Sequence, residues 1–438
     1  MSAAKQFGQM LVVTQAGFEV SLQRHVPPSL YRDFHLWALS SESPCREHYL
    51  QAMGITQLVK LTVALLGDLV EDADWPLLIS YSVPLNVYLT YEAISDNVAI
   101  GLALRGASDT TYELRRDLLL AFNRAMITRL TDDAQPATQL LESLQPAARS
   151  ISSFQYSLNR SQWRSYAEAY LNQRTDVTLA ELEYDMWPAL VANIEACAAA
   201  VQSMAGRQLG VLLRHGLIDR YGPVNRLLRA EEMTPLQLAE VGTDAILVVP
   251  TLIYYIAVLA EIIRPLDRLA RALAHGLLAQ ALRDAALLVR LLNDLGTSLL
   301  ECTAEERDAL LAALATHCQA HPSAQTLGEV FAGVQGYASG LFTRLQKDIA
   351  FGEFNVGLYG LANLPSMPEV LSTFGRNLSY FSQLYAQRRA ALEQTLAVIS
   401  ERLSDERVSL LISRFVWFHE QLYRNPYYTS AGEYAIAV

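Results

Sequence analysis

Residues 287–301 read LLVRLLNDLGTSLLE, an apolar run in which a few polar side chains recur at a regular interval. Asn293, Thr297 and Glu301 are spaced four residues apart, which on an α-helix places all three on one face. An amide oxygen, a hydroxyl and a carboxylate are hard oxygen donors of the kind that Mg²⁺ prefers. The stretch therefore predicts a helix that carries one wall of a magnesium site. A polar stripe on an ordinary amphipathic helix is the alternative interpretation.

Helical spacing extends over most of the chain. Apolar residues recur every three or four positions in two clear examples, Ile55, Leu58, Leu61, Leu65 and Leu66, and then Leu118, Leu119, Phe122, Ala125 and Met126. Sustained alternation of the strand type is hard to find, so the sequence predicts an all-α fold. Prolines such as Pro44, Pro223 and Pro265 are expected to end or restart helices.

Residues 245–260 form the apolar run AILVVPTLIYYIAVLA. Its length approaches what a membrane-spanning helix needs, but Pro250 lies inside it and two tyrosines lie at its centre. We therefore expect a buried core helix and no membrane insertion.

The composition is that of a large globular protein. Hydrophobic residues make up 51% of the 438 positions and charged residues 18%, which is enough for a sizeable core. We expect a single α-helical domain over residues 1–438, with extra helices around 195–245. The net charge of −11 argues against a nucleic-acid partner, because binding a phosphate backbone needs a basic surface. An anionic ligand at the predicted magnesium site would then be bound through the cations and a few local arginines.

The cysteines give no sign of a metal centre or a disulfide framework. They are scattered along the chain without any Cys-x-x-Cys spacing, at Cys45, Cys197, Cys302 and Cys318. The N-terminal residues lack the charged head, apolar block and cleavage site of a signal peptide. A reduced, cytoplasmic setting is expected.

The motif in residues 293–301 resembles the Asn-Asp-x-x-Ser/Thr-x-x-x-Glu signature of class I terpene cyclases at each defining position. The apolar residues 287–292 are similar to the family's approach to that motif. The resemblance implies an α-helical bundle around a central apolar cavity, with three Mg²⁺ ions bound together with the diphosphate of the substrate. It also implies a second metal-binding helix that faces the first.

The second wall is expected in residues 85–97, which read LNVYLTYEAISDN. Glu92 and Asp96 are one helical turn apart, so both carboxylates can share a face, and Asn97 would assist them. This departs from the family's usual Asp-Asp-x-x-Asp pattern, because Glu92 and Ala93 stand at its first two positions. A surface pair of carboxylates is the alternative. Together with the downstream motif, the like charges are interpreted as sharing a cation.

Several arginines are candidates for contacting the diphosphate through charge-assisted hydrogen bonds. Arg290 lies inside the apolar run ahead of the motif. The family often carries an Arg-Tyr pair near the C-terminus that closes over the diphosphate. Two alternatives exist for that pair: Arg424, which has tyrosines on both sides, and Arg376 with Tyr380. For each of them, the other interpretation is an arginine that stacks on an aromatic surface without contacting substrate.

The length and the two motifs are most similar to the non-canonical fungal class I cyclases that make humulene-type macrocycles for tropolone meroterpenoids. That resemblance implies farnesyl diphosphate as substrate and Asp96, Asn293 and Glu301 as catalytic residues that hold the metals while diphosphate departs. The residues themselves indicate only an allylic diphosphate. A chain-elongating prenyltransferase and a non-enzymatic helical scaffold are the rival hypotheses. Related cyclases are often homodimers, but no stretch of this sequence indicates an interface.

Overall fold

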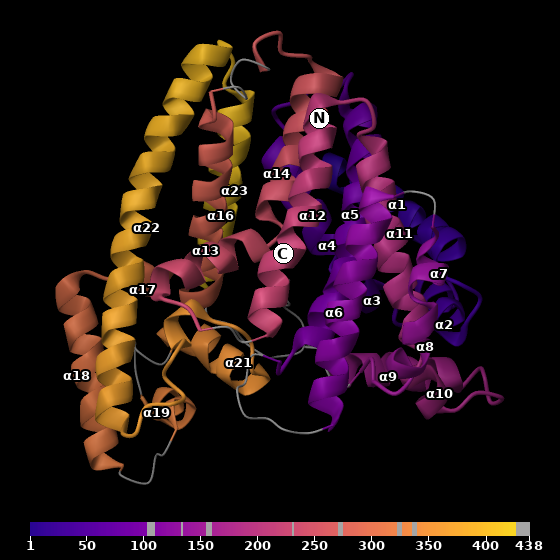
Figure 1. Ribbon diagram of the computed structural model, residues 1–438. Helices are drawn as coiled ribbons and strands as arrows, with labels where there is room; N and C mark the ends of the chain where they lie inside the picture. The colour runs from indigo at the N-terminus through magenta and orange to yellow at the C-terminus, as the bar shows by residue number, and fades with distance from the viewer. Residues whose placement is uncertain are drawn as a thin grey trace. The chain divides into compact units, whose positions relative to one another are not determined.

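The computed structural model describes residues 1–102, 110–132, 135–154, 160–229, 232–269, 275–321, 326–334 and 340–425. All regular secondary structure in these ranges is helical, so the prediction of an all-α fold is confirmed (Figure 1). The chain divides into two compact units. Unit 1 comprises Met1–Leu228 and Pro250–Pro265, and unit 2 comprises Arg229–Val249 and Leu266–Ala437. A single domain with extra helices around 195–245 stays a prediction.

Unit 1 contains the first half of the chain and one later insertion. Its helices are α1 (Ala3–His25), α2 (Leu30–Leu39), α3 (Arg46–Ala52), α4 (Ile55–Leu66), α5 (Trp75–Ala99), α6 (Thr110–Thr131), α7 (Ala137–Leu140), η1 (Glu142–Leu144), α8 (Gln145–Ala148), α9 (Arg160–Leu171), α10 (Leu179–Glu183), α11 (Trp187–Ser203), α12 (Gln208–Leu228), most of α14 (Val248–Ala257) and the π-helical η2 (Val258–Ile263). Helix α5 is central, because α1, α4, α6 and α11 all pack against it. The apolar residues predicted from spacing in α4 and α6 are buried.

Several helices begin at a threonine that caps their free N–H groups. Thr178, Thr234, Thr303 and Thr326 each accept a hydrogen bond from the backbone three residues on, and a Glu or Gln there bonds back to the threonine N–H. This reciprocal capping satisfies donors that the helix itself leaves unpaired.

Proline ends helices at some of the expected positions but not at all of them. Pro44 precedes α3 and Pro265 follows η2, as predicted. Pro223 lies inside α12, so the break expected there was wrong. Tyr221 and Leu228, on either side of it, are both buried, and this packing offsets the one backbone hydrogen bond that proline removes.

The apolar run 245–260 is buried, as predicted, but it does not form one helix. Helix α13 ends at Ala245 and α14 begins at Val248. The two central tyrosines tie α14 into unit 1: the Tyr254 hydroxyl donates to the Tyr81 carbonyl oxygen at 2.6 Å, and the Tyr255 hydroxyl lies 2.7 Å from Thr62 Oγ1. Among the described residues, no single helix is long and apolar enough to cross a membrane. Two pairs of consecutive helices, α3 with α4 and α13 with α14–η2, reach the required length and hydropathy only when the two members are taken together.

Unit 2 is built around α16. Its helices are α13 (Pro235–Ala245), α16 (Leu277–Leu295), α17 (Thr297–Leu300), α18 (Ala304–Ala320), α19 (Leu327–Gly333), α21 (Thr343–Phe351), η3 (Val356–Leu358), α22 (Met367–Leu403) and α23 (Arg407–Arg424). Helices α13, α21, α22 and α23 all pack against α16, whose apolar side chains are buried. The C-terminal end of α16 is therefore enclosed by neighbouring helices and carries the candidate site.

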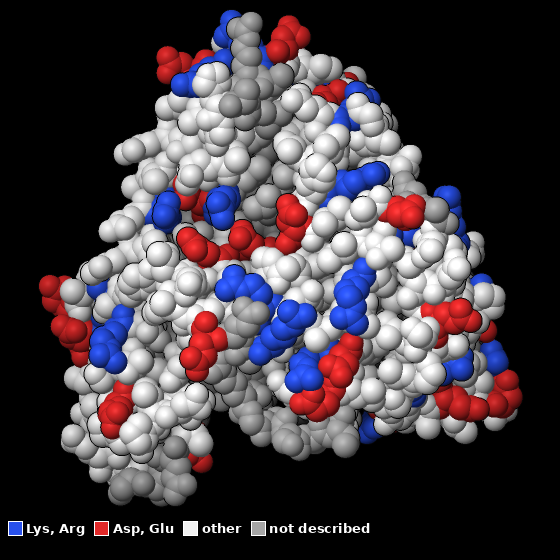
Figure 2. All heavy atoms as spheres, in the orientation of Figure 1, with Lys and Arg blue, Asp and Glu red and all other residues white. Residues whose placement is uncertain are grey.

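Charged side chains are interspersed on the molecular surface. On the face shown in Figure 2, lysines and arginines lie next to aspartates and glutamates over a largely uncharged background. This distribution agrees with a chain in which only 18% of residues are charged.

Candidate functional site

The signature of residues 293–301 does not lie on one continuous helix. Helix α16 ends at Leu295, Gly296 adopts a φ of 82°, and the short helix α17 begins at Thr297. Only glycine takes this backbone conformation without strain. The prediction that Asn293, Thr297 and Glu301 share one helix face was therefore wrong, because the glycine turns the chain between the first and the second of them.

Each of the three side chains has a protein partner. The carbonyl oxygen of Asn293 accepts a hydrogen bond from Arg344 Nε at 3.0 Å, and its amide oxygen lies 3.4 Å from Arg344 Nη2. The hydroxyl of Thr297 is fully buried and donates to the carbonyl oxygen of Glu420 at 2.7 Å. Glu301 forms an ion pair with Arg424 at 2.8 Å, and both side chains are about half exposed.

Asp294, the second residue of the signature, is the best-connected carboxylate of this region. Its Oδ1 lies 2.8 Å from Arg290 Nη2, and its Oδ2 accepts hydrogen bonds from Arg290 Nε at 3.1 Å and from the Val356 N–H at 2.8 Å. The carbonyl oxygen of Asp294 also accepts from Asn355 Nδ2 at 2.7 Å. Burial raises the pKa of Asp294 to about 6, although Arg290 opposes the shift. Sequence analysis missed Asp294, but its four-residue spacing from Arg290 is a signal that could have identified the pair.

A second group of charges lies beside Asp294 on α21 and the turn that follows. Lys347 Nζ is 2.5 Å from Asp348 Oδ1 and 2.8 Å from Glu353 Oε2. Although burial opposes the charge of Lys347, the two carboxylates raise its pKa, and burial raises the pKa of Glu353. Asn355 links these charges to Asp294, because its Nδ2 donates to Asp348 Oδ2 at 2.5 Å and to the carbonyl oxygen of Asp294. We call Arg290, Asp294, Lys347, Asp348, Glu353 and Asn355 the α16 charge network.

The donor set fits a hard cation only in part. Thr297 is unsuited, because its hydroxyl is buried and already bonded to a backbone carbonyl. Glu301 is exposed and Asn293 is half-buried, but an oxygen of each is held by an arginine. In the described ranges, no three His, Cys, Asp or Glu side chains are grouped as metal ligands. A magnesium ion at Asn293 and Glu301 would have to replace Arg344 and Arg424 as their partners.

The second predicted wall of the metal site, residues 85–97, lies on α5 in unit 1. Glu92 is buried and forms an ion pair with Arg220 of α12, 128 residues away in sequence. Asp96 is exposed one turn later, and its charge acts on Arg220 as well. Asn97 is half-buried, and its carbonyl oxygen accepts from the Ile100 N–H at 3.2 Å. The cation that neutralises Glu92 is thus the guanidinium of Arg220. The interpretation that the two carboxylates share a metal ion is corrected accordingly, because the charge of Glu92 is already compensated.

The surroundings of Glu92 are polar although they are buried. Asn193 of α11 donates to Ser95 Oγ at 3.3 Å, and burial together with the charge of Glu92 raises the pKa of Tyr221. Within the described part of the chain, Glu92 Oε2 and Asn193 Oδ1 are buried without a hydrogen-bond donor. In the described part of unit 1, the buried Glu92–Arg220 ion pair therefore lies among polar groups that are not all hydrogen-bonded.

The two alternative Arg-Tyr pairs have different environments. Arg424 contacts Glu301 of the signature, while Tyr427, expected beside it, lies outside the described residues. Arg376 and Tyr380 lie on α22 and line a groove against α18 whose lining includes no residue of the signature. Of the two, the structure brings only Arg424 together with a predicted metal ligand.

Comparisons of the chain with protein-family models, with curated proteins and with solved structures give no match.

Proposed function

We propose that this protein is a Mg²⁺-dependent lyase of the class I terpene cyclase type, which ionises an allylic diphosphate. The observation that carries the proposal is the contact between Glu301 and Arg424, which are 123 residues apart in sequence. A site for a diphosphate and its counter-ions needs oxygen ligands beside guanidinium groups. Asn293 with Arg344 is a second contact of the same kind.

In this proposal, Arg424 and Arg344 bind protein groups when substrate is absent and the diphosphate when it is present. Without substrate, Arg424 neutralises the Glu301 carboxylate at the end of α17, and Arg344 donates to the carbonyl and amide oxygens of Asn293. When an allylic diphosphate binds, the two guanidinium groups would donate charge-assisted hydrogen bonds to its oxygens in place of these contacts. Bound Mg²⁺, held by Asn293 and Glu301, would supply the positive charge that stabilises the departing diphosphate.

The α16 charge network has a positioning role in this scheme. Asp294 holds Arg290 and the backbone of Val356, and its neighbour Asn293 is thereby fixed at the last turn of α16. Thr297 fixes the start of α17 to α23 through Glu420. These contacts set the direction of the Asn293 and Glu301 side chains without placing Asp294 or Thr297 on the substrate.

Farnesyl diphosphate as substrate and a humulene-type macrocycle as product extend the proposal by the resemblance alone. A helical scaffold without enzymatic activity is the competing proposal, because all three signature side chains have protein partners. The two differ in what Glu301 does: in the scaffold it only pairs with Arg424, whereas in the lyase it is needed for turnover.

The test is incubation of the full chain with geranyl, farnesyl and geranylgeranyl diphosphate, with and without Mg²⁺, followed by measurement of released diphosphate and gas chromatography of volatile products. We expect Mg²⁺-dependent release that Glu301→Gln and Asn293→Ala reduce at least about tenfold, since loss even of the groups that support metal ligands costs that much. Glu305→Gln, an exposed carboxylate four residues on, is the matched control. An arm with added isopentenyl diphosphate detects chain elongation. Failure to release diphosphate from any of the substrates would favour the scaffold.

A further inference from the structure

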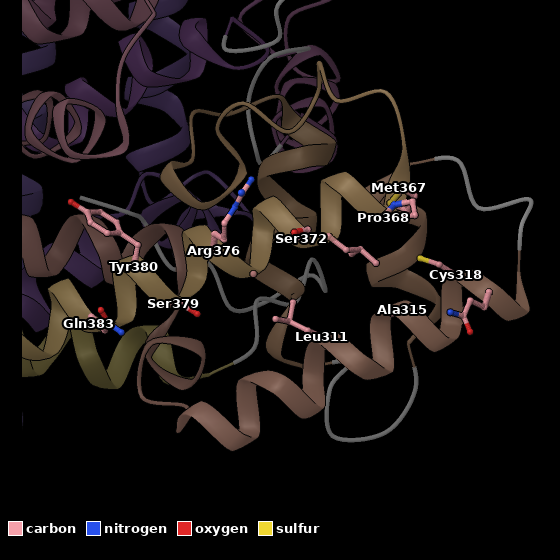
Figure 3. A pocket seen from close by; sticks show the side chains of 13 residues that line it. Leu311, Ala315, Cys318, Met367, Pro368, Ser372, Arg376, Ser379, Tyr380 and Gln383 are labelled. Carbon is pink, nitrogen blue, oxygen red and sulfur yellow. The ribbon is translucent and has the colours of Figure 1, made fainter.

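An open groove runs between α18 and α22 in unit 2 (Figure 3). Its volume is about 930 Å³, which is within the range of small-molecule sites. The lining residues are Leu311, Ala315, Cys318 and Gln319 of α18 and Met367, Pro368, Leu371, Ser372, Gly375, Arg376, Ser379, Tyr380 and Gln383 of α22. None of them belongs to the α16 charge network or to the signature.

The groove is long and its two ends differ. The lining positions on α22 extend from Met367 to Gln383, which corresponds to about 24 Å of helix. One end is formed mainly by apolar groups around Met367 and Cys318, and the other by Arg376, Tyr380 and Gln383. Figure 3 shows this order along α22. Such a shape suits a ligand with one extended apolar chain and one polar end.

Gly375 allows the two helices to lie close together beneath the groove. A Cβ atom at this position would come within 2.7 Å of Leu311 Cδ1, which is too short for a normal contact. The close approach places Leu311 against α22 at the base of the groove, between Ser372 and Ser379 along that helix, and this apolar contact favours a hydrocarbon chain.

The groove carries one charge, and it is positive. Arg376 is the only ionic residue of the lining, and no aspartate or glutamate is part of it. Its Nη2 donates to Thr373 Oγ1 at 2.8 Å, and among the described residues no carboxylate pairs with it. In a chain with a net charge of −11, an arginine without an acidic partner beside an apolar groove is complementary to an anion.

We propose that the groove between α18 and α22 binds a single-chain amphiphile with a singly charged head, of the long-chain fatty acid class. The hydrocarbon chain lies toward Met367 and the carboxylate accepts hydrogen bonds from Arg376. A single guanidinium matches a monoanion, whereas a diphosphate needs several cations around it. The inference does not depend on the proposed function, because the groove shares no residue with the signature.

The test is titration of the full chain with cis-parinaric acid, a fluorescent fatty acid, followed by displacement with palmitate, methyl palmitate or farnesyl diphosphate. We expect saturable binding that palmitate reverses and its uncharged ester does not. Arg376→Gln should weaken binding about tenfold, the effect of losing one charge-assisted hydrogen bond. Arg402→Gln, an exposed arginine on the same helix, should leave it unchanged.

Two variants test the location of the ligand. Ala315→Trp and Ser379→Trp fill the groove from opposite helices and should each abolish binding while the helical circular dichroism signal is kept. Binding that survives both, or no saturable binding by the native chain, overturns the proposal. Stronger displacement by farnesyl diphosphate than by palmitate overturns the assigned ligand class. Because diphosphate release is measured separately, failure of either proposal leaves the other testable.

Discussion

The two units each bury a carboxylate with an arginine, but they satisfy it differently. In unit 1, Glu92 is paired with Arg220, and its second carboxylate oxygen has no hydrogen-bond donor in the described part of the chain. In unit 2, both oxygens of Asp294 are bonded, by Arg290 from the same helix and by the backbone of Val356. A buried charge with a single partner is most sensitive to loss of that partner, whereas a charge with several partners is less sensitive to the loss of any one of them.

The largest effect is expected from Arg220→Met. This change leaves Glu92 buried without its counter-ion and should lower the free energy of unfolding by about 3 to 5 kcal/mol. Urea unfolding followed by circular dichroism measures it, with Arg214→Met on the same helix as the control. The double variant Arg220→Met/Glu92→Leu should recover most of the loss, because no charge then remains buried. A single variant as stable as its control would show that the pair is not important to unit 1.

The second prediction concerns the pH dependence that Asp294 introduces. Burial raises the pKa of this group from 3.8 to about 6 in the folded chain, so between these values the folded state holds a proton that the unfolded state has lost. Its contribution to the free energy of unfolding must therefore fall as pH rises from about 4 to 6, by up to about 3 kcal/mol. Asp294→Asn removes this contribution. The difference between native and variant stabilities, measured by urea unfolding across this range, should change with pH, and a flat difference would contradict the prediction.

The helices could be predicted from the sequence because apolar residues recur with the period of a helical turn. Leu58, Leu61 and Leu65 repeat with the turn of a helix, and all three are buried in α4. The prediction failed where one residue decides the backbone. Gly296 interrupts a pattern of four-residue spacing that is otherwise helical, and its positive φ separates Asn293 from Thr297. Glycine next to a helix end is a recognisable stop signal, so the break could have been anticipated.

The partners of the candidate site residues could be predicted only when they are close in sequence. Arg290 and Asp294 are one helical turn apart, and this spacing indicates their contact. The partner of Glu92 is 128 residues away and that of Glu301 is 123 residues away. No local pattern contains such contacts, because they result from the packing of whole helices. The presence of a candidate arginine could be predicted, but its pairing could not.

A smaller effect is expected at the start of α17. Thr297→Val keeps the shape of the side chain but removes the donor to the Glu420 carbonyl oxygen, which should cost about 1 kcal/mol because a buried hydrogen bond is lost. Thr297→Ser retains the hydroxyl and is the control. If Thr297 were instead a metal ligand, the valine variant would change Mg²⁺ dependence more than stability. Parallel urea unfolding and Mg²⁺ titration of diphosphate release separate these outcomes.

The smallest effect on stability is expected from Glu301→Gln. This variant tests an exposed ion pair, which can be compared with the two buried pairs of Glu92 and Asp294. Glu301 and Arg424 are 43% and 47% exposed, so breaking their contact should change the free energy of unfolding by less than about 1 kcal/mol. In the proposed lyase the same change replaces a charged carboxylate ligand by a neutral amide and reduces diphosphate release, so activity falls while the urea midpoint stays. A large loss of stability would instead assign Glu301 to the framework of unit 2, as in the scaffold alternative. The ratio of the two effects therefore distinguishes a site from a structural contact.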